Sequence, residues 1–302
     1  MATQHEMEAT YNYMDEIFRL SLGETGDCSG AMYNGDFGKN VIQAQADKHN
    51  YVLDALNLHA GSRMLDIGCG WGAMLAAIKK REGDGVGLTL STKQARACRR
   101  NNLEVYVENW KNISVKTFGK FDGVVSIGSF EHFCAINEYL SGKQKEIYRE
   151  FFRLCSTLLP ENGRLYLQTM MWGPNAPEYK DISLNASRSS NEHMLAVLKK
   201  FYSAGSWLPS GEEQIIEAAQ PYFKVISLNN GRRDYIETLR QWGDAIWKPS
   251  LAKVAAALKL LPYFVRDKDF RYRLETLLHG YNRECFIREV MDHQRIVFEK
   301  IY

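Results

Sequence analysis

Residues 63–72 read RMLDIGCGWG, a short apolar run that ends in an acid and continues into alternating glycines before a helical segment. This order predicts a strand, a tight turn and a helix N-terminus, where a cofactor can approach the backbone because glycine has no side chain. Nicotinamide and flavin sites use similar turns. Asp66 favours S-adenosylmethionine instead, because a carboxylate repels a pyrophosphate but tolerates the ammonium group of an amino-acid-like ligand. The alternative interpretation is that this glycine turn binds no ligand and only connects a core strand to a helix.

Length and charge limit the class of protein. The chain of 302 residues is long enough for a large core, and we expect one domain with an elaborated cap. The formal net charge of +2 is nearly balanced, so we expect no nucleic acid as a partner. Basic clusters at residues 79–81, 96–100 and 199–200 are typical of solvated helix faces. They also suit an anionic surface that carries the substrate, such as a peripheral membrane contact or an acidic carrier protein.

The six cysteines are scattered, and no two of them have the spacing of metal ligands or of a redox pair. We therefore expect reduced thiols, no metal site and a cytoplasmic protein. The N-terminus lacks a basic and apolar signal, and no apolar run reaches the length of a membrane-spanning helix, about 18 residues. Any contact with a membrane is expected at its cytoplasmic surface.

From residue 63 to residue 170, predicted strands alternate with predicted helices. We expect strands at 63–67, 84–89, 103–108, 121–127 and 163–170, and helices at 72–81, 91–101 and 143–158. This alternation predicts an α/β fold with a doubly wound parallel sheet, whose ligands lie at the carboxyl ends of the strands.

The flanking segments are mainly helical. Helices are expected at 6–21, 39–57 and 211–220, two long helices across 233–287, and strands at 223–228 and 295–301. Between Pro174 and Pro209, apolar residues at helical spacing predict a helix that is either simply packed or part of a lid over an apolar substrate. We expect a single domain over 1–302, with a helical cap (1–58), a cofactor-binding core (59–172), a lid (173–210) and the remaining core with a helical insertion (211–302).

An acid and a histidine follow the predicted strand at 121–127. The segment VSIGSFEHF, residues 125–133, places Glu131 and His132 beside the cofactor, where they could move protons or stabilise positive charge. With LDIGCGWG (65–72), VGLTLS (86–91) and YIETLRQW (235–242), it resembles the cyclopropane-fatty-acid and mycolic-acid synthases, which methylate unsaturated acyl chains. The motif YNYMDEIFRL (11–20) and the tripeptide LPS (208–210) extend this resemblance over nearly the whole chain.

The resemblance implies the Rossmann-like sheet of a class I methyltransferase, with N-terminal helices and a helical lid. It also implies which residues bind S-adenosylmethionine. Gly68, Gly70 and Gly72 would hold the methionine portion, with Tyr11 closing over it, and Thr89, Leu90 and Gln94 would hold the ribose and adenine side. The full predicted set also contains Asp66, Trp110 and Ile127.

A bicarbonate ion that removes a proton after methyl transfer is a further implication of the resemblance. Its expected holders are Glu146 and Tyr235. This chain has Gln168 where the family has a histidine, and Gly30 where the family has a cysteine, and residues 135–145 look like an insertion. Glutamine can donate a hydrogen bond but cannot carry a proton as histidine can. The predicted catalytic set is therefore Glu131, His132, Glu146, Tyr235 and Gln168, with bicarbonate left open.

Two functions agree with these residues. The first is methylation or cyclopropanation of an unsaturated lipid acyl chain, in which aromatic faces and a carboxylate stabilise the carbocation and no metal is required. The second is a small-molecule C-, N- or O-methyltransferase of specialised metabolism. A nicotinamide-dependent oxidoreductase is disfavoured by Asp66 and Trp71, and a binding protein without catalysis is a further alternative. An apolar tunnel beneath residues 174–209 would favour the lipid, and a compact polar pocket the small metabolite.

Overall fold

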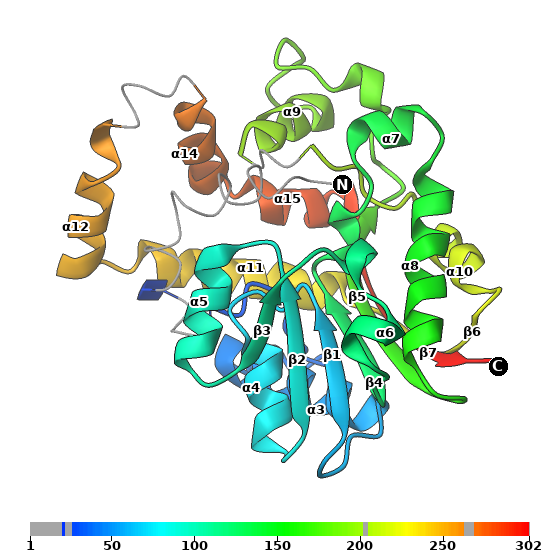
Figure 1. Cartoon of the computed structure of the whole chain (residues 1–302). Coiled ribbons are helices and arrows are strands. Elements are labelled where there is room, and N and C mark those ends of the chain that lie inside the picture. Colours follow the sequence, from blue (N-terminus) through cyan, green and yellow to red (C-terminus); the bar gives the residue numbers. More distant parts are fainter. Residues whose placement is uncertain (1–19, 22–25, 202–204, 263–268, 302) are drawn as a thin grey trace.

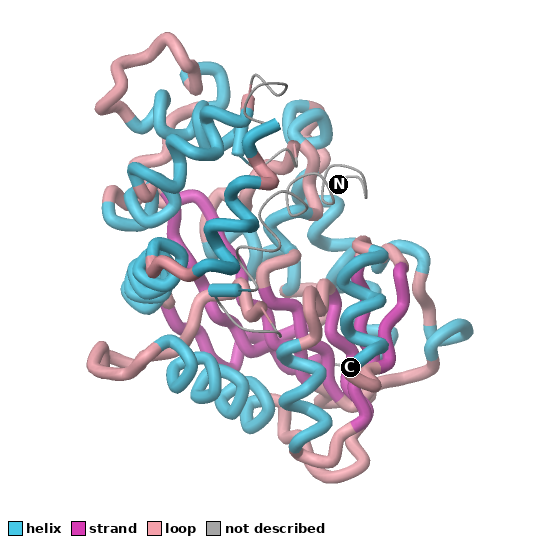
Figure 2. Tube along the Cα trace, turned by 90° about the vertical axis from the view of Figure 1, so that its left-hand side faces the viewer, coloured by secondary structure: helices cyan, strands magenta, loops and turns pink. Residues whose placement is uncertain are grey.

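The computed structural model describes residues 20–21, 26–201, 205–262 and 269–301. A seven-stranded sheet runs through the middle of the molecule with helices around it (Figure 2). The predicted helix at 6–21 lies outside the described residues, apart from its last two positions.

The sheet has the strand order β3-β2-β1-β4-β5-β7-β6 (Figure 1). Its strands are β1 (Arg63–Ile67), β2 (Asp84–Thr89), β3 (Glu104–Val107), β4 (Gly123–Ile127), β5 (Arg164–Trp172), β6 (Phe223–Asn230) and β7 (Met291–Lys300). The first five strands are parallel, as predicted. The last two strands, for which the sequence predicted no direction, are not part of this parallel set, because β7 is antiparallel to both β5 and β6. The chain enters β7 opposite Trp172, at the carboxyl end of β5, so β7 must run back along that strand.

Helices pack around this sheet and over the carboxyl ends of its strands (Figure 1). Within the described residues, the helices of four or more residues are α3 (Val41–Ala55), α4 (Ala73–Lys80), α5 (Thr92–Arg100), α6 (Val115–Phe118), α7 (Ile136–Leu140), α8 (Gln144–Leu158), α9 (Asn191–Phe201), α10 (Glu212–Ala219), α11 (Arg232–Trp247), α12 (Leu251–Leu258), α14 (Phe270–His279) and α15 (Tyr281–Ile287). Residues 233–287 therefore form four described helices rather than two. Pro249 separates α11 from α12, and Gly280, with a φ of 62°, separates α14 from α15. The last strand also begins four residues earlier than expected, at Met291.

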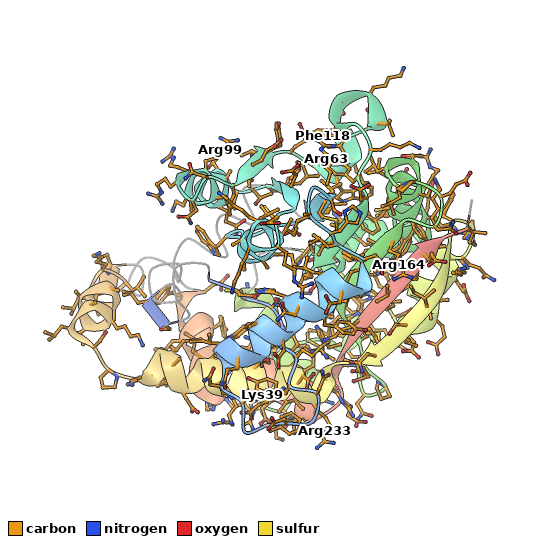
Figure 3. The ribbon with its side chains drawn as sticks, turned by 90° about the horizontal axis from the view of Figure 1, so that it is seen from below. Lys39, Arg63, Arg99, Phe118, Arg164 and Arg233 are labelled. Atoms are coloured by element: carbon orange, nitrogen blue, oxygen red, sulfur yellow. The ribbon has the colours of Figure 1, made fainter. Side chains whose placement is uncertain are left out.

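Local sequence signals fix several of these elements. The Asn40 side chain accepts a hydrogen bond from the Gln43 amide, and Gln43 accepts one from the Asn40 amide, which completes the N-terminal cap of α3. At the amino ends of the strands, Arg63 donates to the carbonyl of Phe118, and Arg164 donates to the carbonyl of Ala55 (Figure 3). These contacts tie the neighbouring loops to the amino ends of the strands.

A cluster of aromatic rings surrounds the short turn that follows β4. Phe151 and Phe152 of α8 pack against Phe130, which stacks on Tyr148 with ring centroids 4.4 Å apart. All four side chains are buried. Because Phe130 directly precedes Glu131, this packing fixes the short turn that carries the acid into the site.

Candidate active site

Two adjoining cavities lie at the carboxyl ends of the strands. The first has a volume of about 190 Å³ and is lined by residues that follow β1, β2 and β4. The second has a volume of about 320 Å³ and is lined by residues of β5, β7 and helices α9, α11, α14 and α15. Cys28, Ser29, Gly128 and His132 line both cavities. A ligand in the first cavity can therefore meet a ligand in the second.

The glycine turn after β1 forms one wall of the first cavity. Gly68 and Gly70 have φ angles of 88° and 53°, in the region that favours glycine. A Cβ atom on Gly70 would have no heavy atom within 4 Å, so this face of the turn is open to a ligand. Gly72 is different, because it does not line the cavity and its Cβ would lie 2.7 Å from Leu103 Cδ1. Its predicted place beside the cofactor is wrong, and its lack of a side chain instead leaves room for Leu103 and for Cys98 of α5.

The other described residues predicted to bind the cofactor all line the first cavity. They are Asp66, Gly68, Gly70, Thr89, Leu90, Gln94, Trp110 and Ile127. Thr89 Oγ1 donates to Gln94 Oε1 at 2.7 Å, which fixes the Gln94 amide next to the end of β2. Trp110 Nε1 is buried and has no hydrogen-bond partner among the described residues. Burial, together with the nearby charge of Asp27, raises the pKa of Asp66 to about 7. The predicted residue Tyr11 lies outside the described residues.

A buried ion pair forms the floor of this cavity, and sequence reasoning missed it. Lys48 Nζ lies 2.8 Å from Asp27 Oδ2, and His49 Nε2 lies 2.8 Å from the same oxygen. Burial opposes ionisation of Asp27, but Lys48 and His49 outweigh it and hold the pKa of Asp27 well below its usual range. The available signal was the place of Lys48 on α3, four residues after Ala44 and four before Val52 on a buried face.

The walls of the second cavity are mainly apolar. The larger side chains that line it include Trp172, Leu195, Leu198, Trp207, Trp242 and Phe286. Leu195 and Leu198 belong to α9, the helix expected from the apolar spacing between Pro174 and Pro209. Lys199, Asn282 and Arg283 add polar groups to the same lining. The cavity thus has the character of an apolar chamber more than of a compact polar pocket.

Polar side chains gather where the second cavity borders Gly128 and Gly30. Four predicted catalytic residues line it: Glu131, His132, Gln168 and Tyr235. Thr169 Oγ1 donates to Glu131 Oε2 at 2.9 Å, and burial raises the pKa of Glu131 to about 7. His132 Nδ1 lies 3.0 Å from Ser206 Oγ, and burial lowers the pKa of His132 to about 4, so its ring is neutral at pH 7.

Gln168 has both ends of its amide engaged. Its Nε2 donates to the carbonyl of Gly30 at 2.8 Å, and its Oε1 accepts from the Tyr166 hydroxyl at 3.0 Å. The side chain is 1% exposed. It therefore holds the loop at Gly30 against β5.

Glu146 is not part of this group. It lies exposed on α8 and lines neither cavity, so its predicted place in the site is wrong. The inward face of α8 at this level carries Gln144, whose Nε2 donates to the carbonyls of Trp207 and Leu208. The expected insertion at 135–145 contains α7, and Ala135 pairs with Ser206 beside the cavity.

His293 of β7 also lines the second cavity, although the sequence analysis did not single it out. The register of the sheet places it opposite Met170. A Cβ atom on Gly30 would lie 3.3 Å from His293 Nε2 and 3.2 Å from Tyr235 Cδ2. The signal in the sequence was the polar run 292–295 directly before an apolar stretch, and the structure buries three of these residues, His293, Gln294 and Arg295.

Within the part of the chain that the structure describes, no group of three His, Cys, Asp or Glu side chains could hold a metal ion. No helix among these residues has both the length and the apolar character needed to cross a membrane.

The fold and the comparisons with solved structures agree on the class of protein. The structure aligns with mycolic acid cyclopropane synthase CmaA1 complexed with SAH and CTAB at a TM-score of 0.77 and 27% identity, over 98% of each chain. Coclaurine N-methyltransferase shares the fold at a TM-score of 0.67 and 17% identity, over 97% of this chain and 82% of that one. The protein is a class I S-adenosylmethionine-dependent methyltransferase.

Sequence comparisons define the family. A family model described as mycolic acid cyclopropane synthetase matches residues 1–260. Cyclopropane mycolic acid synthase 3 of Mycobacterium tuberculosis is 33% identical over 249 residues, which are 80% of this chain and 81% of that protein. Hydroxymycolate synthase MmaA4 of Mycobacterium bovis is 29% identical over 253 residues, which are 80% of this chain and 77% of that protein. The chain belongs to the mycolic acid cyclopropane synthetase family, in agreement with the resemblance of its motifs.

Proposed function

We propose that this enzyme transfers the methyl group of S-adenosylmethionine to a carbon–carbon double bond in a lipid acyl chain. The observation that carries the proposal is the second cavity, which is mainly apolar and borders the first cavity at Gly128 and His132. An apolar chamber of this kind suits an acyl chain better than a charged metabolite. The names of relatives such as cyclopropane mycolic acid synthase 3 also give a lipid as the product.

The residues of the first cavity fit S-adenosylmethionine. Gly70 leaves its face of the cavity open, and the Trp110 indole N–H is a buried donor without a partner among the described residues. Asp66 would face the ammonium end of the ligand, and Thr89 with Gln94 would hold its ribose side. When bound there, the cofactor supplies an electrophilic methyl group on a sulfonium ion.

The polar end of the second cavity would stabilise the charge that forms. When an alkene takes up the methyl group, its other carbon is left as a carbocation. The Glu131 carboxylate and the face of the Tyr235 ring both line this end of the cavity and can stabilise that cation. The surrounding apolar side chains exclude water, which would otherwise capture the cation.

Bicarbonate, the base that the family resemblance implies, does not fit these residues. Glu146, one of its expected holders, is exposed on α8. The Gln168 amide is already engaged by Gly30 and Tyr166. Residue 30, where the family has a cysteine, is glycine here, and the His293 ring borders the position that a side chain would occupy. The proposed reaction therefore has no step through bicarbonate.

Vesicles of dioleoylphosphatidylglycerol and S-adenosylmethionine with a tritiated methyl group test the proposed function. We expect label in the acyl chains, as a cyclopropane or a methyl branch, and the same rate with and without added bicarbonate in carbonate-depleted buffer. Vesicles of diphytanoylphosphatidylglycerol are the matched control, because their chains are fluid but have no double bond. No label in the dioleoyl lipid would refute the proposal. Methylation of small amines or alcohols instead would establish the alternative function.

We also propose that helix α12 rests on an anionic lipid surface. Leu251, Val254 and Leu258 follow one another at intervals of three and four residues, which places them on one face of α12, and Trp247 and Leu261 lie just before and just after this helix. All five are exposed, and Leu251 is 90% exposed. The exposed residues Lys248 and Lys259 add the charge that attracts anionic head groups.

A cytoplasmic location agrees with the free thiols of five buried cysteines.

Co-sedimentation with the same anionic vesicles measures this contact. Leu251→Glu combined with Leu258→Glu is expected to weaken binding at least about tenfold, because each change removes apolar area and adds a charge that the lipid repels. Leu140→Glu is the matched control, since Leu140 is 60% exposed on α7, outside this face. Equal binding by the double variant and the unchanged protein would contradict the proposal.

A further inference from the structure

His293 is a buried imidazole with no assigned task in the methyl transfer described above. The side chain is 2% exposed, and its Nδ1 has no hydrogen-bond partner among the described residues. Its ring packs against the Tyr235 ring, with centroids 4.9 Å apart. Nε2 lies on the side of the ring that faces Gly30, at the border of the second cavity.

The surroundings of this imidazole keep it neutral. Burial, reinforced by the positive charges of Arg295 and Lys48, holds the pKa of His293 well below its usual range. Arg295 donates to Asp234 at 2.8 Å, and Lys48 is paired with Asp27, so both cations are held in place by carboxylates. A neutral imidazole has one ring nitrogen with a free lone pair, which can accept a proton.

We infer that His293 is the base that removes the proton from the methylated intermediate. This inference rests on the proposed function, because only an alkene acceptor creates a carbocation that must lose a proton from carbon. His293 takes the place in the reaction that the family resemblance assigned to bicarbonate.

The step balances without another reactant. The alkene uses its π electrons to bond the transferred carbon, and the sulfonium becomes a thioether. The His293 lone pair then takes a proton from the added methyl group, and the electrons of that C–H bond join its carbon to the cationic carbon. The products are a cyclopropane and an imidazolium. Loss of a proton from an adjacent chain carbon gives a methyl-branched alkene instead.

A weakly basic imidazole is sufficient for this step. A C–H bond next to a carbocation is far more acidic than an imidazolium ion, so transfer to His293 is favourable. Arg295 and Lys48 then favour release of the proton to water, which restores the neutral ring for the next turnover. Gln168 cannot substitute for it, because an amide is not a base at neutral pH.

The test compares His293→Gln with the unchanged protein on dioleoylphosphatidylglycerol vesicles. Turnover is expected to fall at least about 100-fold, with KM and the affinity for S-adenosylmethionine changed less than about threefold. Proton removal should then limit the rate, so a trideuterated methyl group should slow the variant several-fold more than the unchanged protein when the product is a cyclopropane. Deuterium on the carbons beside the double bond gives the same comparison for a methyl-branched product.

Two further variants separate catalysis from structure. His59→Gln is the matched control, because His59 is exposed at the opposite edge of the sheet, and it should leave turnover unchanged. His293→Ala leaves a space beside the cavity, and added imidazole should restore part of its turnover.

The outcomes separate the two claims. Absence of methylation by the unchanged protein refutes the proposed function, and this inference with it. If the unchanged protein methylates the vesicles, an active His293→Gln variant with an unaltered isotope effect overturns the inference alone. If His293→Gln also loses the cofactor, failure of imidazole to restore His293→Ala overturns it.

Discussion

Gly70→Val is expected to abolish binding of S-adenosylmethionine. A side chain at residue 70 would enter the open space of the first cavity, where no protein atom lies within 4 Å of the added Cβ. A loss of affinity of about 100-fold or more corresponds to about 2.7 kcal/mol. Calorimetry with S-adenosylmethionine and with its demethylated product measures the loss, while circular dichroism monitors the fold.

The control for this variant must reproduce its backbone strain. Gly142→Val does so, because Gly142 has a φ of 72°, is exposed after α7 and also has no atom within 4 Å of its Cβ position. It should bind the cofactor with the affinity of the unchanged protein. Unaltered affinity in Gly70→Val would show that the ligand lies elsewhere.

Glu131→Gln is expected to lower turnover about 100-fold to 1000-fold while changing cofactor affinity little. Glutamine keeps the shape of the side chain and can still accept the hydrogen bond from Thr169, so the main loss is the negative charge. Burial raises the pKa of Glu131 to about 7. Turnover of the unchanged protein should therefore rise as the pH increases through about 7 and the carboxylate ionises, and this rise should be absent from the variant.

Glu161→Gln is the matched control for Glu131→Gln, since Glu161 is exposed in the loop before β5. Single-turnover rates and calorimetric affinities should be measured for both variants. Equal losses of turnover and cofactor affinity in Glu131→Gln would assign the residue to cofactor binding or to structure.

The first five strands could be predicted because their signals are local. Each is a short apolar run followed by a turn and a helical pattern, and neighbours in the chain are close to one another in the sheet. The direction of β7 has no such signal, because it depends on the side from which the chain returns after α15. The breaks in 233–287 were visible at Pro249 and Gly280, but the apolar periodicity on both sides led to the expectation of longer helices.

The part of the candidate site that consists of sequence motifs could be predicted. Glu131, His132 and the glycine turn lie directly after strands, so their position at the carboxyl edge follows from local order. Glu146 was placed in the site by the family resemblance, but its helix carries both charged and apolar positions, and only tertiary packing decides which of them face the cavity. The place of Lys48 in the site depends on its ion pair with Asp27, and the place of His293 depends on its position beside Gly30. His293 and Gly30 are more than 250 positions apart in the sequence.

Strand β7 lies between β5 and β6, and it brings a residue from the end of the chain into the site. Two separate stretches of the chain therefore supply the groups that act in the proposed reaction. The wall that faces the methyl donor is built from residues 26–133, whereas His293 comes from the last strand, beyond the residues 1–260 that the family model matches. The match to the family model therefore includes the donor wall, Glu131 and Tyr235, but not the residue proposed as the base. Exchange of this one strand between relatives offers a route to new products with an unchanged donor site.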